Sequence, residues 1–242
     1  MENNFLNFSR ADIDKPIFRI IPIERLFKLF EKKINILVSP ELWEDPFENF
    51  IMNSKVKFQS GISMGLGFRK NLYGQCWTQT RENDALWRIY SPEKKGVRLT
   101  TTSRKLLYSL KEYGNPEKYK NCFIGKVQYY NTKELLNLLK LQGANFIFDD
   151  SGVGHAQTLL FKRIAFKHEN EVRLIYNSYN QFNHTKIGFE IDPYELIDDI
   201  VFDPRIEYKL FKSYKDKLVK IGFKKRIVRS NLYRIPELEI KL

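Results

Sequence analysis

The chain has 242 residues, 43% of them hydrophobic and 14% aromatic, which predicts a compact folded protein and argues against intrinsic disorder. Its two cysteines, Cys76 and Cys122, lie far apart and belong to no C-x-x-C pair, which argues against a disulfide framework or a zinc site and favours a reduced, cytoplasmic protein. The formal net charge of +12 suits an acidic partner such as nucleic acid.

Short apolar strands alternate with amphipathic helices along the sequence. Strands are predicted at 17–21, 34–38, 73–80, 96–102, 121–130, 186–191 and 198–203. Helices are predicted at 22–33, 84–90, 132–142 (ended by Gly143), about 156–166, and along an apolar stripe from Ile206 to Ile221 with Gly222 as the C-terminal stop. The glycines of residues 60–71 indicate a mobile loop.

This order of elements, without repeats or a Pro/Gly-rich linker, predicts one α+β domain of mixed or antiparallel sheet over residues 1–242. No stretch is apolar enough to cross a membrane, and the N-terminus has no signal-peptide core, so we expect no membrane association. The three histidines show no ligand spacing and predict no metal site.

The stretch "FKHENEVRLIY" (166–176) combines two carboxylates and a guanidinium. If it is a strand throughout, Glu169, Glu171 and Arg173 share one face and the apolar residues share the other. The structural interpretation is an exposed ion pair between Glu169 and Arg173. The functional interpretation is a catalytic carboxylate, Glu171, with Glu169 orienting or deprotonating an acceptor.

The run "CWTQTRENDALWRIY" (76–90) carries three large aromatic residues. Trp77 falls on a predicted strand, and Trp87 and Tyr90 are three residues apart on the short helix that follows. Such rings can hold a flat heteroaromatic group by stacking and cation–π attraction, and the alternative is ordinary core packing.

The segment "WEDPFEN" (43–49) contains three acids around a proline. A helix start explains them: Asp45 as N-cap, Pro46 in the first turn, and Glu48 closing a capping box.

The positive charge is concentrated near the C-terminus. Residues 205–234 contain eleven Lys or Arg against two acids, Glu207 and Asp216, a local balance of 11 − 2 = +9. We expect this helix and strand to belong to the same domain and to present a basic face to nucleic acid or an acidic protein, the alternative being a solubilising surface. The candidate contact residues are Lys212, Lys215, Lys220, Lys224, Lys225 and Arg226.

Several segments together resemble a bacterial family known as domain of unknown function twenty-nine seventy-one. They are "FRIIPIERLFKLF", "WEDPFEN", "CWTQTRENDALWRIYSPEKKGVRL", "LLFKRIAFKHENEVRLIY" and "IVFDPRIEYK". That family is distantly similar to the ADP-ribosyltransferases, including the DarT-type toxins that modify DNA. The resemblance implies an ADP-ribosyltransferase-like core and NAD as substrate.

The resemblance also implies roles for individual residues. Arg19 would hold the ribose or pyrophosphate of NAD, Trp77 with Trp87 or Tyr90 would surround nicotinamide, and Glu171 would be catalytic with Glu169 beside it. The sequence departs from the pattern in lacking a His-Gly pair on the first strand. The residues "TTTS" at 100–103 compete with Trp77 for the middle-strand role.

Three functions follow as hypotheses. The leading one is an NAD-dependent mono-ADP-ribosyltransferase without a metal, acting as a toxin or phage-defence effector on nucleic acid or protein. The second is a non-catalytic nucleic-acid-binding protein. The third is a metal-dependent nuclease that uses Asp45, Glu48, Glu169 and Glu171.

Overall fold

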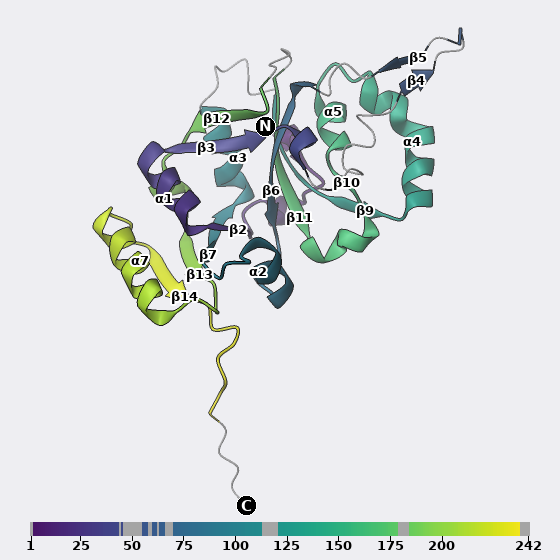
Figure 1. The fold of residues 1–242 in the computed structure, drawn as a ribbon. Coiled ribbons are helices and arrows are strands. Elements are labelled where there is room, and N and C mark those ends of the chain that lie inside the picture. Colours follow the sequence, from purple (N-terminus) through teal and green to yellow (C-terminus); the bar gives the residue numbers. More distant parts are fainter. Residues whose placement is uncertain are drawn as a thin grey trace, which may run out of the picture.

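The computed structural model describes residues 2–43, 45, 55–57, 60–61, 63–65, 70–112, 121–178 and 184–237. Within these ranges, ten strands form one mixed sheet with the path β1-β8-β11-β6-β2-β7-β13-β14, while β3 branches from β6 and β12 pairs with β3 (Figure 1). Their bounds are β1 (Phe5–Leu6), β2 (Pro16–Pro22), β3 (Ile34–Val38), β6 (Leu72–Thr78), β7 (Gly96–Thr102), β8 (Cys122–Lys126), β11 (Glu171–Asn177), β12 (Lys186–Glu190), β13 (Asp199–Phe202) and β14 (Arg226–Arg229).

Two short ribbons lie apart from this sheet. One is antiparallel, β4 (Lys55–Lys57) with β5 (Ser63–Gly65), and the other is parallel, β9 (Gln128–Tyr130) with β10 (Phe161–Arg163). The helices are α1 (Ile23–Lys32), α2 (Asp84–Tyr90), α3 (Ser103–Glu112), α4 (Thr132–Ile147), α5 (Val153–Thr158), α6 (Pro193–Leu196) and α7 (Tyr208–Lys220). Four 3₁₀ helices are described as well: η1 (Glu2–Asn4), η2 (Arg10–Asp12), η3 (Pro40–Leu42) and η7 (Ile164–Glu169).

The sheet separates two apolar clusters. On one face, Leu26 of α1, Leu106 of α3 and Leu218 of α7 pack with Val172 and Leu174 of β11. On the other face, residues of β8 and β11 pack against the end of α5, and α4 lies outside it (Figure 1). Because apolar side chains bury both faces of β11, the polar residues of this strand lie in the interior as well.

The strand β6 has two different neighbours on one of its edges. It pairs with β2 only at Phe18↔Thr78 and with β3 only at Val38↔Gly74. The strands β2 and β3 therefore diverge along β6, and the residue after Phe18, Arg19, stands at the point where β2 leaves it.

The predicted α+β class with a mixed sheet is confirmed, and so are most elements. The strand 34–38, the helix 84–90 and the strand 96–102 have the predicted bounds, and Gly222 has the positive φ, 95°, of a helix stop. The basic segment supplies α7 and β14, and β14 joins the main sheet beside β13.

Three predictions of local structure were wrong. The helix predicted at about 156–166 is replaced by α5, β10 and η7, and the strand predicted from residue 166 begins only at Glu171. The helix α4 does not end at Gly143 but continues to Ile147. Tertiary packing of Phe146 and Ile147 outweighs the weak helix propensity of one glycine. Much of the glycine-rich stretch 60–71 lies outside the described residues, but Ser63–Gly65 forms β5.

Two helical glycines provide a test of the packing between α4 and α5. A Cβ at Gly154 would lie 2.7 Å from the carbonyl oxygen of Phe146, whereas a Cβ at Gly143 meets nothing within 4 Å. We expect Gly154→Ala to lower the free energy of unfolding by about 1–3 kcal/mol, because α5 must move away from α4. Gly143→Ala should raise it by about 0.5–1 kcal/mol through helix propensity. Urea unfolding of both variants checks this, and a neutral Gly154→Ala would contradict it.

Candidate active site

The pairing of β11 with β6 decides which side chains share the site. Glu171 lies opposite Thr78 and Arg173 opposite Cys76, so these four side chains point to one face of the sheet. Val172 and its partner, Trp77, point to the other face.

Glu171 is a buried carboxylate, 6% exposed, with several donors around it. Its Oε2 accepts hydrogen bonds from Arg173 Nε at 3.1 Å and Nη2 at 2.5 Å, and Lys162 Nζ lies 3.4 Å away. The Cys76 thiol donates a further hydrogen bond to this carboxylate. Burial acts to raise the pKa of Glu171, but the charges of Arg173 and Lys162 and these hydrogen bonds outweigh it, and the net pKa is lowered. Glu171 is therefore ionised at neutral pH.

Arg173 is held as firmly as its partner. Its side chain is completely buried, its Nη1 donates to the carbonyl oxygen of Leu159 at 2.7 Å, and its guanidinium lies 4.4 Å from the ring centre of Trp43. The Trp43 ring in turn covers Gly74 of β6, where a Cβ would approach it to 2.7 Å. The ion pair predicted between Glu169 and Arg173 was wrong, because Arg173 pairs with Glu171.

Glu169 reaches the same site from a different element. It is the last residue of η7, and Asn170, with φ 44°, turns the chain into β11. Thr78 donates to the carbonyl oxygen of Glu169 at 2.5 Å, which fixes this turn against the end of β6. The Glu169 side chain is buried, and its Oε2 accepts a short hydrogen bond from Lys162.

Tyr90 connects α2 to the carboxylates. Its hydroxyl lies 3.5 Å from Glu169 Oε1, and its side chain is 42% exposed, so it stands at the rim of the site. Desolvation of the hydroxyl and the negative charges of Glu169 and Glu171 raise the pKa of Tyr90, which keeps it protonated at neutral pH.

Arg19 brings a positive charge within electrostatic reach of Cys76. It is half-buried, and desolvation lowers the pKa of its guanidinium to about 10, with the charge of Arg25 acting in the same direction. Cys76 and Tyr90 act to raise the pKa of Arg19. Arg25, Cys76 and Tyr90 are therefore all within electrostatic reach of Arg19. Among the described residues, neither Arg19 nor Arg25 forms an ion pair. Two neighbouring guanidinium groups without an acid suit an anionic ligand.

The two tryptophans are not part of this arrangement. Trp77 is 5% exposed, lies in the core on the face away from Glu171, and donates through Nε1 to Gln75 at 2.7 Å. Trp87 is fully buried and donates to Glu82 at 3.0 Å. Of the predicted nicotinamide-binding aromatics, the structure brings only Tyr90 to the carboxylates.

Asp45 also approaches the site. Asp45 accepts a hydrogen bond from Arg163 of β10 at 2.9 Å, next to Lys162 in the sequence. The other members of the predicted capping box, Pro46 and Glu48, lie outside the described residues.

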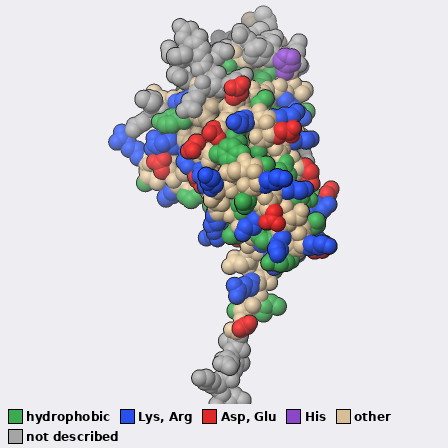
Figure 2. Space-filling view, turned by 90° about the vertical axis from the view of Figure 1, so that its left-hand side faces the viewer, with side chains coloured by type: hydrophobic (Ala, Val, Ile, Leu, Met, Phe, Trp, Pro, Cys, Tyr) green, Lys and Arg blue, Asp and Glu red, His purple; other side chains and the backbone are tan. Residues whose placement is uncertain are grey.

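The predicted nucleic-acid contacts are all exposed, on the side of the molecule that carries α7 (Figure 2). Basic and acidic side chains are interspersed there. Lys225 binds the carbonyl oxygens of Tyr194 and Ile197, at 2.6 and 2.9 Å, and Arg226 lies 3.6 Å from Asp199. These two residues stabilise the fold, whereas Lys212, Lys215, Lys220 and Lys224 are available to a ligand.

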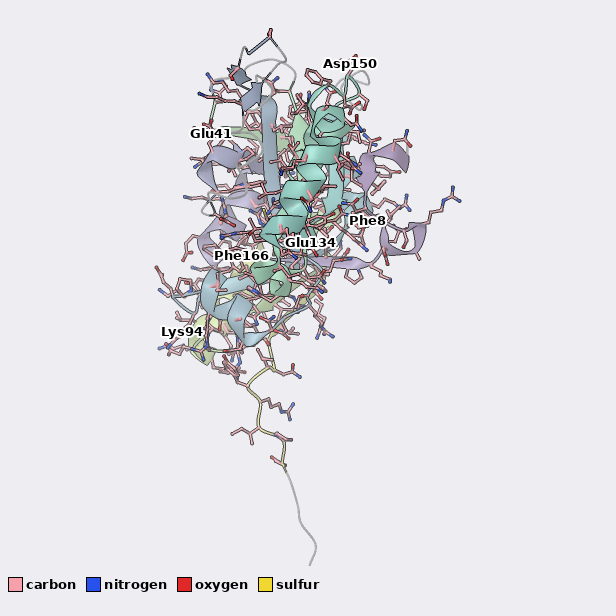
Figure 3. All side chains as sticks on the ribbon, turned by 90° about the vertical axis from the view of Figure 1, so that its right-hand side faces the viewer. Phe8, Glu41, Lys94, Glu134, Asp150 and Phe166 are labelled. Carbon is pink, nitrogen blue, oxygen red and sulfur yellow. The ribbon has the colours of Figure 1, made fainter. Side chains whose placement is uncertain are left out.

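A groove of about 1020 Å³ lies away from the carboxylates, between the N-terminal segment and helices α4 and α5. A smaller recess of about 150 Å³ adjoins it and is lined by residues that include Gln128 and Phe161. In the ribbon β9–β10, Gln128 pairs with Phe161, and the next pair is Tyr129 with Lys162. Successive residues of a strand point to opposite sides, so the recess and the carboxylates lie on opposite faces of this ribbon. Figure 3 views this side, with Phe166 of η7 and Glu134 of α4 labelled.

The described residues contain no group of three or more His, Cys, Asp or Glu placed to hold a metal ion. Within the same residues, no helix has the length and apolar character that a bilayer crossing requires.

Comparisons with known proteins give two findings. Residues 86–174 match the model of a family described as protein of unknown function (DUF2971), which confirms the resemblance seen in the sequence. Comparison with curated proteins finds no match.

Three solved structures of DarT from Thermus sp. 2.9 resemble the fold. The complex with NAD+ has 13% identity and a TM-score of 0.39, and covers 90% of this chain and 96% of that chain. The complex with carba-NAD+ has 13% identity and a TM-score of 0.39, with coverage of 92% and 97%. The complex with ADP-ribosylated ssDNA has 12% identity and a TM-score of 0.41, with coverage of 93% and 96%. These identities transfer no residue role from DarT to this chain.

Several residues of the site were not singled out in the sequence. Lys162, Tyr129 and Trp43 were not predicted as site residues, and their positions in the site follow from pairings between distant segments. The Tyr129 hydroxyl accepts a hydrogen bond from the Glu171 N–H at 2.8 Å, and burial raises the pKa of Tyr129 to about 12. Nothing in the local sequence sets Lys162 apart, because Arg163 and Lys167 are close to it in the same segment.

Because the Glu171–Arg173 pair is buried, we expect truncation of Arg173 to lower the stability of the fold strongly. Arg173→Met leaves Glu171 with less compensation in the interior, and we expect a loss of about 3–5 kcal/mol in the free energy of unfolding at pH 7. The control is Arg104→Met, which removes a bidentate pair with Asp14 at the surface and should cost at most about 1 kcal/mol. Similar losses in chemical denaturation would show that the Glu171–Arg173 pair behaves like a surface pair.

Proposed function

We propose that the protein is an NAD-dependent mono-ADP-ribosyltransferase with Glu171 as its catalytic carboxylate. The observation that supports this best is the meeting of Tyr90, Glu169 and Glu171 from three separate elements, with Arg19 of a fourth element within electrostatic reach of Tyr90 and Cys76. A guanidinium with no acidic partner among the described residues, a hydroxyl and two ionisable carboxylates are the groups that binding and cleaving a dinucleotide requires.

Each residue has a role in this proposal. Arg19, assisted by Arg25, binds the pyrophosphate or the ribose by charge-assisted hydrogen bonds. Tyr90 lies at the rim, where its ring contacts nicotinamide. Glu171 stabilises the positive charge that develops on the ribose, because it is ionised and held in place by Arg173 before the reaction.

The reaction exchanges one bond for another at the ribose. The bond between C1′ and the nicotinamide nitrogen breaks, and nicotinamide leaves with the electron pair. The nucleophilic atom of the acceptor bonds to C1′, and its proton passes to Glu169, which acts as the general base. An effector that modifies nucleic acid or protein in this way would act as a toxin or in phage defence.

The proposal predicts NAD cleavage that depends on Glu171. Glu171→Gln should lower the rate of nicotinamide release by about a hundredfold or more, because the amide cannot stabilise the developing charge. The control, Glu190→Gln, changes an exposed glutamate of β12 and should retain the full rate. Nicotinamide is measured by chromatography with NAD alone and with single-stranded DNA, RNA and protein acceptors.

Calorimetric NAD binding to the Glu171→Gln variant separates catalysis from folding, since this variant should still bind. Equal rates in wild type and Glu171→Gln, or no release with any acceptor, would overturn the proposal.

The exposed lysines of α7 favour a second candidate function, a non-catalytic nucleic-acid-binding protein. It predicts binding that is weakened by salt and unaffected by NAD. Changing Lys212, Lys215 and Lys220 together to Gln should lower the slope of log K against log salt by about three, because each lysine would no longer neutralise a phosphate. The control changes Lys28, Lys32 and Lys33, which are exposed at α1, and should keep the slope. Fluorescence anisotropy with a labelled oligonucleotide measures both, and equal slopes would exclude α7 as the binding surface.

The metal-dependent nuclease receives no support from the described residues. Asp45 is paired with Arg163, and Glu169 and Glu171 are paired with cations of the chain. Glu48, its remaining ligand, lies outside the described residues.

A further inference from the structure

Lys162 has an unusual position for a lysine. It is 6% exposed and lies in β10, opposite Tyr129 of β9, on the face of the ribbon that is turned toward the carboxylates. Lysine is rarely buried, because removing an ammonium group from water is costly unless it is paired.

The ammonium group of Lys162 contacts both glutamates. It donates a short hydrogen bond to Glu169 Oε2 and lies 3.4 Å from Glu171 Oε2. Its Nζ also lies 4.7 Å from the ring centre of Phe166, which holds it from the side of η7. One cation therefore bridges two carboxylates that come from different elements.

The charges of this cluster balance only if Lys162 is present. Glu169 and Glu171 bring two negative charges, and Arg173 and Lys162 bring two positive ones. Without Lys162, two neighbouring carboxylates share one buried guanidinium, and such a pair cannot keep both members ionised. The other groups that face the cluster are Cys76 of β6, Tyr90 of α2 and Tyr129 of β9.

We propose that Lys162 is a positioning residue of the active site, which keeps Glu171 ionised and turns the Oε2 atoms of both glutamates away from the substrate. Glu169 Oε1, which faces Tyr90, is thereby left for the acceptor. The catalytic part of this inference rests on the proposed transferase function, but its electrostatic part does not.

The test compares Lys162→Met and Lys162→Arg with Lys167→Met, a control at an exposed lysine of η7. The first readout needs no substrate. In wild type the lowered pKa of Glu171 contributes stability that is present above about pH 4.5 and lost as the pH falls further. In Lys162→Met we expect the pKa of Glu171 to rise above its unfolded value, so this carboxyl group destabilises the folded protein increasingly as the pH rises from about 4.5 to the new pKa. The loss of unfolding free energy relative to wild type should therefore be larger at about pH 7.5 than at about pH 5.

The second readout is the pH profile of nicotinamide release. Lys162→Met should move its acid limb upward by about one pH unit or more, the size expected for losing an opposite charge at this distance. Lys162→Arg should restore most of the wild-type profile, and Lys167→Met should leave it unchanged.

Each outcome either supports or overturns the inference about Lys162. A stability loss in Lys162→Met that is the same at both pH values, with an unmoved acid limb, would show that Lys162 only fills space, and the inference would fail. If none of the proteins releases nicotinamide, the transferase proposal fails, and the pH dependence of stability still decides whether Lys162 sets the charge of Glu171.

Discussion

The candidate site depends on a buried cluster of four charges, Glu169 and Glu171 with Lys162 and Arg173. A single carboxylate in this interior would be neutral, because ionisation in a desolvated place is costly. The two cations make ionisation favourable and at the same time fix the carboxylates in one geometry. The surrounding structure serves this geometry: Leu159 orients Arg173, Tyr129 accepts from the Glu171 N–H, and Thr78 fixes the turn that carries Glu169.

The strand β6 connects this cluster to the rest of the site. It pairs with β11 along its whole length, which places Cys76 and Thr78 beside the charged residues. On its other edge β2 leaves it directly after Phe18, and Arg19 is therefore not enclosed between two paired strands. Arg19 comes from β2 and Glu171 from β11, which lie on either side of β6. The strand β6 thus fixes the position of Arg19 relative to Glu171 and keeps the two side chains apart.

The sequence predicted the fold class and the central position of Glu171, but the site only in part. Alternation along 171–177 identified the strand, because local periodicity reports which residues face a core. It extended the strand too far, since the left-handed turn at Asn170 has no periodic signature. Trp77 and Trp87 were predicted to surround nicotinamide because they are aromatic. Sequence spacing, however, does not distinguish a ring that packs in the core from one that lines a cleft. Lys162 was not identified, because its contact with both glutamates arises from the pairing of β10 with β9 and from the turn after η7, which are tertiary features.

The ribbon β9–β10 has a further consequence. It is only two strands wide, with Tyr129 and Lys162 on one side and Gln128 and Phe161 lining the recess on the other. The same two short strands thus separate Glu169 and Glu171, on one side, from the recess on the other. A shift of this ribbon by a fraction of an ångström changes the distance from the lysine ammonium to both acids at once. A ligand that fills the recess would therefore pack against the same two strands that carry Tyr129 and Lys162.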